Sequence, residues 1–265
     1  MINGRELIAY VSFYNEGRWE DIYDFIKQKK AVDKDEVKDI SNKLNSEYIT
    51  LLDEKYPNVF KKKLSKPPFT LFYKGDYSLI LDSKYKRLSI VGSRKATKYG
   101  IEAVKKIIRE LPSNYVIISG LAYGIDSIAH QTALECGLKT IAVLGSGINS
   151  PYPEVNLSLY NDIVANGGLI ISEYPNLTKP QKENFIFRNR IIACLGDFLL
   201  VGEAYERSGT STTISYALQC GNNVGCIPYP IGTNSMCNTY IKEGAYLIDS
   251  GKEIINIMNN ESGSY

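Results

Sequence analysis

From about residue 69 onward, short and nearly continuous apolar runs alternate with longer amphipathic segments. The runs are SIVGS, YVIISG, TIAVLG, GLIISEY, DFLLVGE and NVGCIPY. Segments such as YGIEAVKKIIREL, IDSIAHQTALECG and STTISYALQCG lie between them and are long enough for crossover helices. Strands that are apolar on both faces are typical of parallel sheets covered by helices, so the pattern predicts the α/β class. We expect an extended Rossmann-like, doubly wound, mostly parallel sheet over residues 69–257.

The N-terminal part of the chain has a different pattern. Residues 1–60 place apolar side chains at helical spacing among charges of both signs, as in ELIAYVSFY, which predicts a small N-terminal helical domain. Residues 61–68 read KKKLSKPP, where two prolines exclude a helix. We expect a solvated linker there, with a lysine binding patch as the alternative. Residues 258–265 lack core-forming content and are predicted to be a flexible tail.

Composition restricts the choice of function only weakly. The 265-residue chain is 44% hydrophobic and 23% charged, which is ordinary for a globular protein, and its net charge is only +2. A nucleic-acid role would therefore need local clusters of Lys and Arg. No apolar run approaches bilayer length, and the start, MINGRELIAY, has no signal-peptide pattern. We expect a cytoplasmic protein with no membrane contact.

Neither a metal nor a cofactor is predicted. The five cysteines form no C-x-x-C pair, and His130 is the only histidine, so a zinc or histidine-rich centre is not expected. The loop that starts at Gly145 reads G-x-G-x-x-S, and no acidic residue is placed at a strand end about 20 residues later to hold a ribose. The P-loop motif G-x-x-x-x-G-K-[ST] is also missing from the sequence. These patterns disfavour a dinucleotide and ATP.

Four predicted strand ends are followed by loops of small and hydroxyl residues, at 92–95, 119–126, 145–150 and 208–213. Such loops expose backbone N–H groups, and a following helix adds its positive end, as anion sites require. We expect DNA contacts at Gly92, Ser93, Arg94, Lys95, Gly120, Gly145, Ser146, Gly147, Ser208, Gly209 and Thr210. The alternative is that each glycine only permits a tight strand-to-helix turn.

Between the third and fourth loops the chain reads KENFIFRNRII. Arginine forks match phosphate oxygens, and an aromatic face stacks a base at about 1–3 kcal/mol, so this combination is typical of single-stranded nucleic-acid binding. The candidate residues are Lys182, Asn184, Phe185, Arg188, Asn189 and Arg190. In the alternative interpretation the arginines are structural and pair with carboxylates such as Glu173 or Glu203.

No catalytic residue is predicted. Asp126 lies one helical turn before His130, but no G-x-S-x-G nucleophile elbow accompanies them. Glu173 and Glu203 both end apolar runs, so a carboxylate pair acting on a glycosidic bond stays open as an enzyme hypothesis.

Seven ordered segments carry a resemblance to a known family. They are IVGSRKATKYG, SGLAYGIDSIAHQTAL, KTIAVLGSGINSPYPEVN, ISEYP, NFIFRNRIIA, SGTSTT and IKEGA. In this order and spacing they resemble the bacterial DNA-processing protein A family, also called DprA or Smf. The resemblance implies a homodimeric Rossmann-type protein that binds single-stranded DNA without sequence preference and without cutting it. It also implies that the protein loads the RecA recombinase on incoming strands during natural transformation.

The resemblance also implies roles for individual residues. Gly92, Ser93 and Arg94, with Lys139, would line a positive pocket for the DNA backbone. Lys182 and Phe185 would lie beside a base.

Two other classes of protein stay open. SGTSTT weakly resembles the phosphate loop of nucleotide phosphoribohydrolases, although the Pro-Gly-Gly and the closing Glu of that loop are missing here. A phosphoribohydrolase or deoxyribosyltransferase-like enzyme on a related sheet is therefore the alternative. The third possibility is an interaction module whose sheet edge only dimerises.

Overall fold

The computed structural model describes residues 3–206 and 208–261 of the chain. Within these ranges nine strands form one sheet, in the order β1-β2-β6-β5-β4-β3-β7-β8-β9. The strands are β1 (Glu47–Thr50), β2 (Thr70–Gly75), β3 (Lys86–Gly92), β4 (Tyr115–Ser119), β5 (Lys139–Leu144), β6 (Leu169–Ser172), β7 (Phe198–Glu203), β8 (Asn223–Cys226) and β9 (Tyr246–Leu247). β2 is antiparallel to both β1 and β6, and all other neighbouring pairs are parallel.

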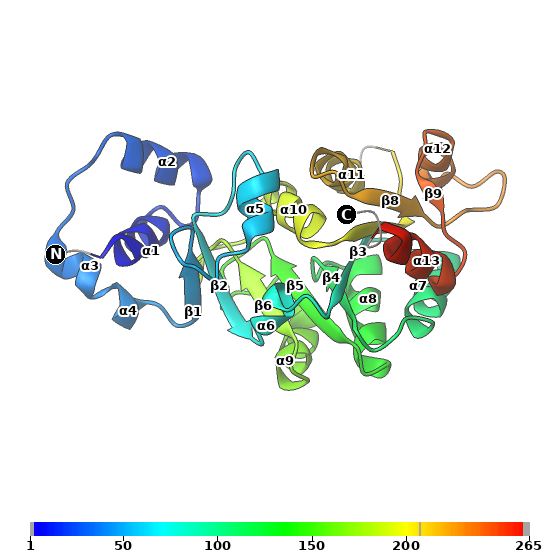
Figure 1. Ribbon diagram of the computed structural model, residues 1–265, viewed down its shortest axis with the longest axis horizontal. Coiled ribbons are helices and arrows are strands. Elements are labelled where there is room, and N and C mark those ends of the chain that lie inside the picture. The colour runs from blue at the N-terminus through cyan, green and yellow to red at the C-terminus, as the bar shows by residue number, and fades with distance from the viewer. Residues whose placement is uncertain (1–2, 207, 262–265) are drawn as a thin grey trace.

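Helices cover both faces of this sheet. They are α1 (Gly4–Tyr14), α2 (Trp19–Lys27), α3 (Lys34–Lys38), α4 (Ile40–Lys43), α5 (Asn58–Lys63), α6 (Ser78–Leu81), α7 (Lys98–Arg109), α8 (Ile125–Glu135), α9 (Leu157–Ala165), α10 (Lys182–Leu195), α11 (Gly209–Gln219), α12 (Cys237–Lys242) and α13 (Gly251–Glu261). A short 3₁₀ turn, η1 (Glu154–Asn156), precedes α9. Figure 1 shows α8 and α9 on one side of the central strands and α10 and α11 on the other. The predicted α/β class and the mostly parallel, doubly wound sheet are confirmed.

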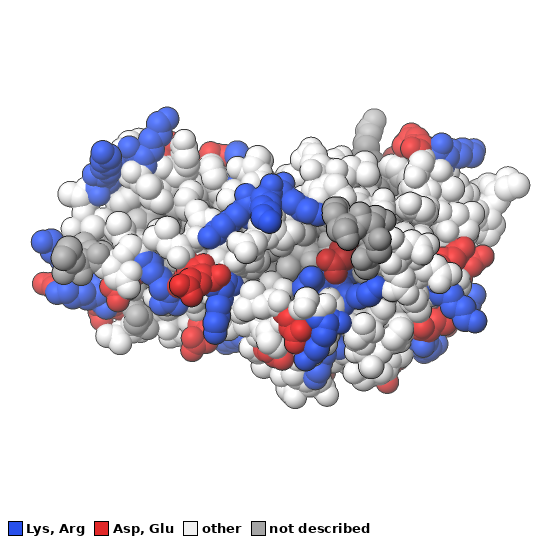
Figure 2. Space-filling view, in the orientation of Figure 1, with Lys and Arg blue, Asp and Glu red and all other residues white. Residues whose placement is uncertain are grey.

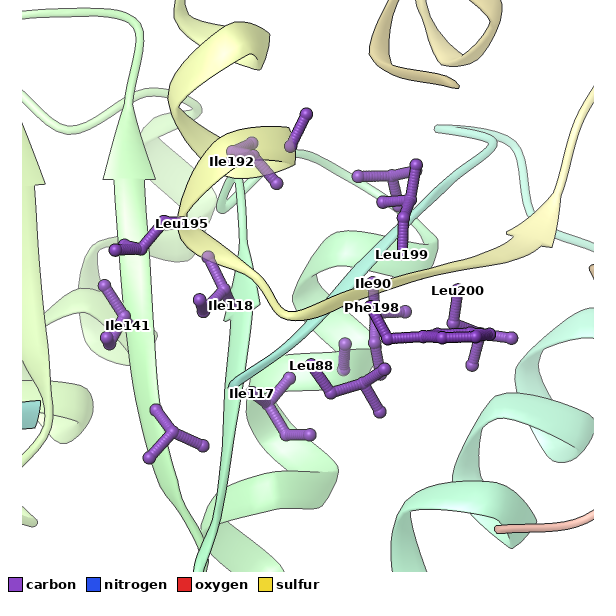
Figure 3. Packing of buried hydrophobic residues seen from close by; sticks show 14 of the residues in the cluster. Leu88, Ile90, Ile117, Ile118, Ile141, Ile192, Leu195, Phe198, Leu199 and Leu200 are labelled. Atoms are coloured by element: carbon purple, nitrogen blue, oxygen red, sulfur yellow. The ribbon is translucent and has the colours of Figure 1, made fainter. Parts of the chain in front are cut away.

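The central strands are apolar on both faces because both faces are covered. Leu88 and Ile90 of β3 are fully buried, as is Phe198 of β7. Figure 3 shows these side chains in the same core as Ile192 and Leu195 of α10. A polar side chain inside such a strand is buried and bonded within the core, as Ser89 is to the carbonyl of Ile192, so side chains that contact a ligand are expected at the strand ends.

The strand order creates a crevice beside β3. From β3 the chain adds β4, β5 and β6 toward one edge, then returns to place β7 on the other side of β3, with β8 and β9 beyond it. The connections that leave β3 and β7 therefore diverge. Ligands of open α/β sheets bind at such a switch point, outside the carboxyl ends of the strands.

The N-terminal segment is joined to the sheet more closely than a domain boundary at residue 60 implies. α1 to α4 lie at one end of the molecule (Figure 1), but β1 is an edge strand of the main sheet. The Arg5 guanidinium forms an ion pair with Asp53 at 2.8 Å and donates to the carbonyl of Tyr48. Trp19 donates from Nε1 to the carbonyl of Pro67 at 2.8 Å. The sheet thus begins at residue 47, inside the predicted helical domain.

The expected linker and tail also differ from the structure. The prolines of 61–68 stand after the end of α5, so they do not prevent residues 58–63 from forming a helix, and Phe60 buries its ring in the core. At the other terminus α13 continues to Glu261 and buries Met258, so the chain is still helical where the tail was expected to begin. Residues 262–265 of the expected tail lie outside the described residues.

Candidate nucleic-acid interface

A cleft of about 1340 Å³ lies beyond the carboxyl ends of β3 and β7, at the switch point of the sheet. Its walls come from the loop after β3, the segment after β4 with Ala122 and Asp126, the first turns of α10, and the loop that leads into α11. The structure brings eleven of the predicted residues into this lining: Gly92, Ser93, Arg94, Lys95, Lys182, Phe185, Arg188, Asn189, Ser208, Gly209 and Thr210.

The loop after β3 is held in place by a buried carboxylate. Glu203, at the end of β7, accepts hydrogen bonds from the backbone N–H of Thr97 at 2.8 Å and from Tyr205. Its carbonyl accepts the N–H of Ser93 at 2.9 Å. A Cβ on Gly92 would lie 2.7 Å from a side-chain carbon of Ile125, so only glycine lets α8 approach the strand end this closely. These restraints fix the backbone while the side chain of Arg94 stays exposed to the cleft.

Two guanidinium groups lie close to the ring of Phe185. The guanidinium carbon of Arg94 lies 5.6 Å from the centroid of the Phe185 ring, and that of Arg188 lies 5.9 Å away. The ring of Tyr152 is 5.6 Å from the Phe185 ring, centroid to centroid. Gly145 lies directly behind Phe185, because a Cβ there would be 2.6 Å from the ring. An aromatic face with two flanking cations thus stands in the wall of the cleft, which is an arrangement that stacks planar rings and attracts anions.

Arg188 is a buried cation that backbone carbonyls hold. Its Nη1 donates to the carbonyl of Gly120 at 2.9 Å and to that of Val143. Burial lowers the pKa of Arg188 to about 10, and burial raises the pKa of the neighbouring Asp126. No ion pair joins Arg188 to a carboxylate in the described part of the chain, although its side chain reaches the lining of the cleft. The charge of Asp126, which also lines the cleft, acts on Arg188 without a direct ion pair. A desolvated guanidinium that forms no direct ion pair attracts an anion into the cleft.

Arg190 has a different environment although it is only two residues further along α10. It forms a two-pronged ion pair with Glu173, at 2.7 and 2.6 Å, and both side chains are almost fully buried. Its Nε donates to the carbonyl of Lys66, and its guanidinium stacks 3.6 Å from the ring centroid of Phe187. The structural interpretation of the arginines therefore describes Arg190, which lies outside the cleft.

Seven predicted residues are not in the lining of the cleft: Gly120, Lys139, Gly145, Ser146, Gly147, Asn184 and Arg190. The loop after β5 packs against the segment after β6, since the N–H of Gly147 donates to the carbonyl of Thr178 at 2.8 Å. Ser146 donates to its own loop, at the carbonyl of Ser150. Lys139 begins β5, so it lies at the amino end of the sheet, where it donates to the carbonyl of Asn166 at 2.7 Å. Gly120 and Gly145 support Arg188 and Phe185 from behind.

Sequence reasoning missed two aromatic residues of the lining. Tyr152 follows the third glycine loop and Tyr205 precedes the fourth, and both line the cleft. The signal that could have found them is an aromatic residue within a few positions of a glycine-rich loop, as in SPYPE and EAYERSG.

Of the candidate catalytic groups, Asp126 accepts the backbone N–H of Gly120 at 3.2 Å and lines the cleft, whereas the others are engaged in structural contacts away from it. His130 is fully buried, its Nδ1 lies 2.7 Å from the hydroxyl of Thr140, and burial lowers its pKa to about 3. Glu173 pairs with Arg190, Glu203 holds the loop after β3, and neither lines the cleft. Among the described residues, no three His, Cys, Asp or Glu side chains come together as a metal site. None of the described helices is both long and apolar enough to cross a membrane.

Comparison with known families identifies similar proteins over most of the chain. Residues 47–259 match a family model described as DNA recombination-mediator protein A. The DNA processing protein DprA of Streptococcus pneumoniae is 41% identical over 208 residues, which are 78% of this chain and 72% of that protein. The DprA of Bacillus subtilis is 35% identical over 225 residues, which are 82% of this chain and 73% of that protein.

Comparison with solved structures also identifies DprA proteins as similar to this chain. The X-ray structure of DprA from Streptococcus pneumoniae superposes with a TM-score of 0.77 at 33% identity, covering 96% of this chain and 93% of that one. DprA from Helicobacter pylori, whose structure is described as giving insight into a single-stranded DNA binding mode, superposes with a TM-score of 0.72 at 29% identity. That match covers 82% of this chain and 98% of the Helicobacter chain.

The buried pair between Arg190 and Glu173 predicts a large effect on stability. Glu173→Gln removes the countercharge of a buried guanidinium, so we expect the free energy of unfolding to fall by about 3 kcal/mol or more in urea titrations. Glu20→Gln removes one partner of an exposed pair with Lys66 and should cost at most about 1 kcal/mol. Equal losses for the two variants would contradict this account of α10.

Proposed function

The chain belongs to the DNA recombination-mediator protein A family, and we propose that its cleft binds single-stranded DNA. Support comes from the family model, which covers both the sheet and the cleft, and from the described DNA binding mode of the Helicobacter pylori relative. The proposed contacts are the eleven predicted residues that line the cleft, together with Tyr152.

One observation carries this proposal: the guanidinium carbons of Arg94 and Arg188 lie 5.6 and 5.9 Å from the Phe185 ring centroid, and neither arginine forms a direct ion pair within the described residues. An exposed cation and a buried one therefore face the same space beside an aromatic ring. A nucleotide offers the matching groups, because its phosphate is an anion and its base is a flat ring. We assign the phosphate to Arg94 and Arg188, and a stacked base to Phe185.

The proposed binding is independent of sequence. The cleft presents cations, hydroxyl groups and an aromatic ring, and these recognise the phosphates and ring faces that all nucleotides share. Asn189 also lines the cleft, but its Oδ1 accepts a hydrogen bond from Nε of Arg188 at 3.2 Å, so the amide is oriented by the protein itself.

Arg94→Ala tests the proposed phosphate contact. Losing one phosphate contact on a single strand lowers the slope of log K against log salt by about 0.7, which is about a fivefold weaker affinity near 0.1 M salt. Fluorescence anisotropy should show this loss equally for homopolymeric and mixed sequences. Arg109→Ala is the matched control, because Arg109 is exposed at the far end of α7 and should leave binding unchanged. Equal affinities for Arg94→Ala and the wild type would reject the site.

We also propose a role for the protein in recombination. We infer that the protein acts as a cytoplasmic homodimer and loads RecA on incoming strands during natural transformation. The description of the family as recombination mediators supports this role, and so does a cleft lined by groups that recognise features common to all nucleotides.

Loading of RecA can be measured directly. On single strands already coated by a single-strand-binding protein, the wild type should restore RecA-dependent ATP hydrolysis. Arg94→Ala should restore it less, in proportion to its weaker DNA binding. Absence of stimulation by a wild-type protein that binds DNA would contradict the mediator role while leaving the cleft intact.

We further propose that the cleft binds without catalysis. Glycosidic cleavage by a carboxylate pair needs two carboxyl groups beside the bond, whereas Glu173 and Glu203 are committed to Arg190 and Thr97. Purified protein incubated with nucleoside monophosphates should therefore release no free base, as followed by chromatography. Base release that Arg94→Ala abolishes would instead support the phosphoribohydrolase-like alternative.

A further inference from the structure

A second cluster of cations lies on α5, far from the loops of the cleft. Lys61, Lys62 and Lys63 form the last turn of this helix, and all three are exposed. Figure 2 shows Lys and Arg side chains gathered over α5 in the upper middle of the view. We call these three residues the α5 lysine patch.

The α5 lysine patch is not neutralised by the protein. No carboxylate forms an ion pair with any of its three lysines within residues 3–206 and 208–261. The ammonium group of Lys63 donates to the Oδ1 of Asn222 at 2.9 Å, and that of Lys61 lies 5.4 Å from the ring centroid of Tyr56. Both contacts are with neutral groups, so the positive charge of the patch remains available to a ligand.

The patch stands on a rigid support. Phe60 is fully buried in the main core, and the carbonyls of Val59 and Lys63 accept the thiols of Cys194 in α10 and Cys220, just after α11. The segment therefore lacks the freedom of a solvated linker. A patch fixed in this way binds a ligand without the entropy cost of ordering its own backbone.

α10 connects the patch to the cleft. The first residue of α10, Lys182, lines the cleft, whereas Cys194 near its end contacts α5 beside the start of β7. The patch therefore lies toward the amino ends of the strands, about 20 Å from Lys182 by the length of a 14-residue helix. A strand held in the cleft that continues along the α10 and α11 side of the sheet reaches the patch.

The chemistry of the patch favours a phosphate backbone over a protein partner. Protein interfaces depend on buried aromatic and apolar anchors, and none of the large exposed hydrophobic side chains belongs to α5. Lysines act as point charges without base contacts, which suits the repeating charge of a strand.

We propose that the α5 lysine patch is a second contact for the backbone of single-stranded DNA, used by strands too long for the cleft alone. This inference rests on the proposed function of the cleft. It adds a separate surface whose contribution depends on the length of the strand.

Oligonucleotide length separates the two surfaces. We would compare Lys61→Gln/Lys62→Gln with the wild type on oligothymidylates of about 4 and about 30 nucleotides, since single-strand sites span about 4–16 nucleotides and the shorter strand is too short to reach from the cleft to the patch. The variant should bind the short strand normally. On the long strand its salt slope should fall by about 1.4 and its affinity about 25-fold near 0.1 M salt, at about 0.7 per lost contact. Lys242→Gln/Lys252→Gln is the matched control, with the same charge change at exposed lysines of α12 and α13.

The binding measurements test the patch and the cleft separately. Unchanged binding of the long strand by Lys61→Gln/Lys62→Gln would overturn the proposal, and so would an equal loss in the control variant, which would indicate a general effect of charge. A loss on the short strand as well would place the patch inside the cleft site and also overturn it. Failure of the wild type to bind even the short strand would instead reject the function of the cleft. Thermal unfolding of both variants checks that the exposed substitutions leave the fold intact.

Discussion

The ion pair between Arg190 and Glu173 is the interaction on which the cleft depends. Two charges removed from water are stable only as a close, hydrogen-bonded pair, and the geometry here supplies both prongs. The pair ties α10 to the end of β6, and the bond from Arg190 to the carbonyl of Lys66 adds the segment after α5. α10 is thereby fixed in rotation as well as in position. That rotation determines which of its side chains face the cleft.

Helix geometry explains why two arginines in one short motif have opposite environments. Residues two apart on a helix point to nearly opposite sides, so Arg190 enters the interior when Arg188 reaches the cleft. One cation is neutralised by a carboxylate and stabilises the fold. The other donates to backbone carbonyls and to the Asn189 side chain, lies near the Phe185 ring and forms no direct ion pair among the described residues. A motif that pairs cations and aromatics thus stabilises the fold through Arg190 and lines the cleft with Arg188.

Because both faces of the sheet are buried, side chains that contact a ligand are restricted to the two ends of its strands. At the carboxyl ends of the strands, the divergent connections of β3 and β7 leave a cleft, and the buried Glu203 stiffens one of its walls. Toward the amino ends of the strands, α5 carries the lysine patch, which forms no ion pair with a carboxylate among the residues that the structure describes. α10 runs between these two ends, so a DNA strand bound along its side of the sheet would contact both the cleft and the patch. Under the proposed function, the molecule would support an extended strand, with a base stacked on Phe185.

The sequence alone determined the class of fold and named eleven of the residues that line the candidate cleft. Strands buried on both faces have no alternative to apolar runs, and chain entry into a helix after such a strand requires small residues, so both features are local and readable. The sequence also identified the segment 182–192 as a mixture of cations and aromatics. Tertiary structure decided which glycine loops line the cleft and excluded the one after β5, because that loop lies two strands away from β3 and folds against the segment after β6. It decided that Arg188 faces the cleft and Arg190 faces Glu173. It also made residues 47–50 a strand and 58–63 a fixed helix, because the partners that stabilise them, β2 and α10, are distant in the chain and their contacts leave no local pattern.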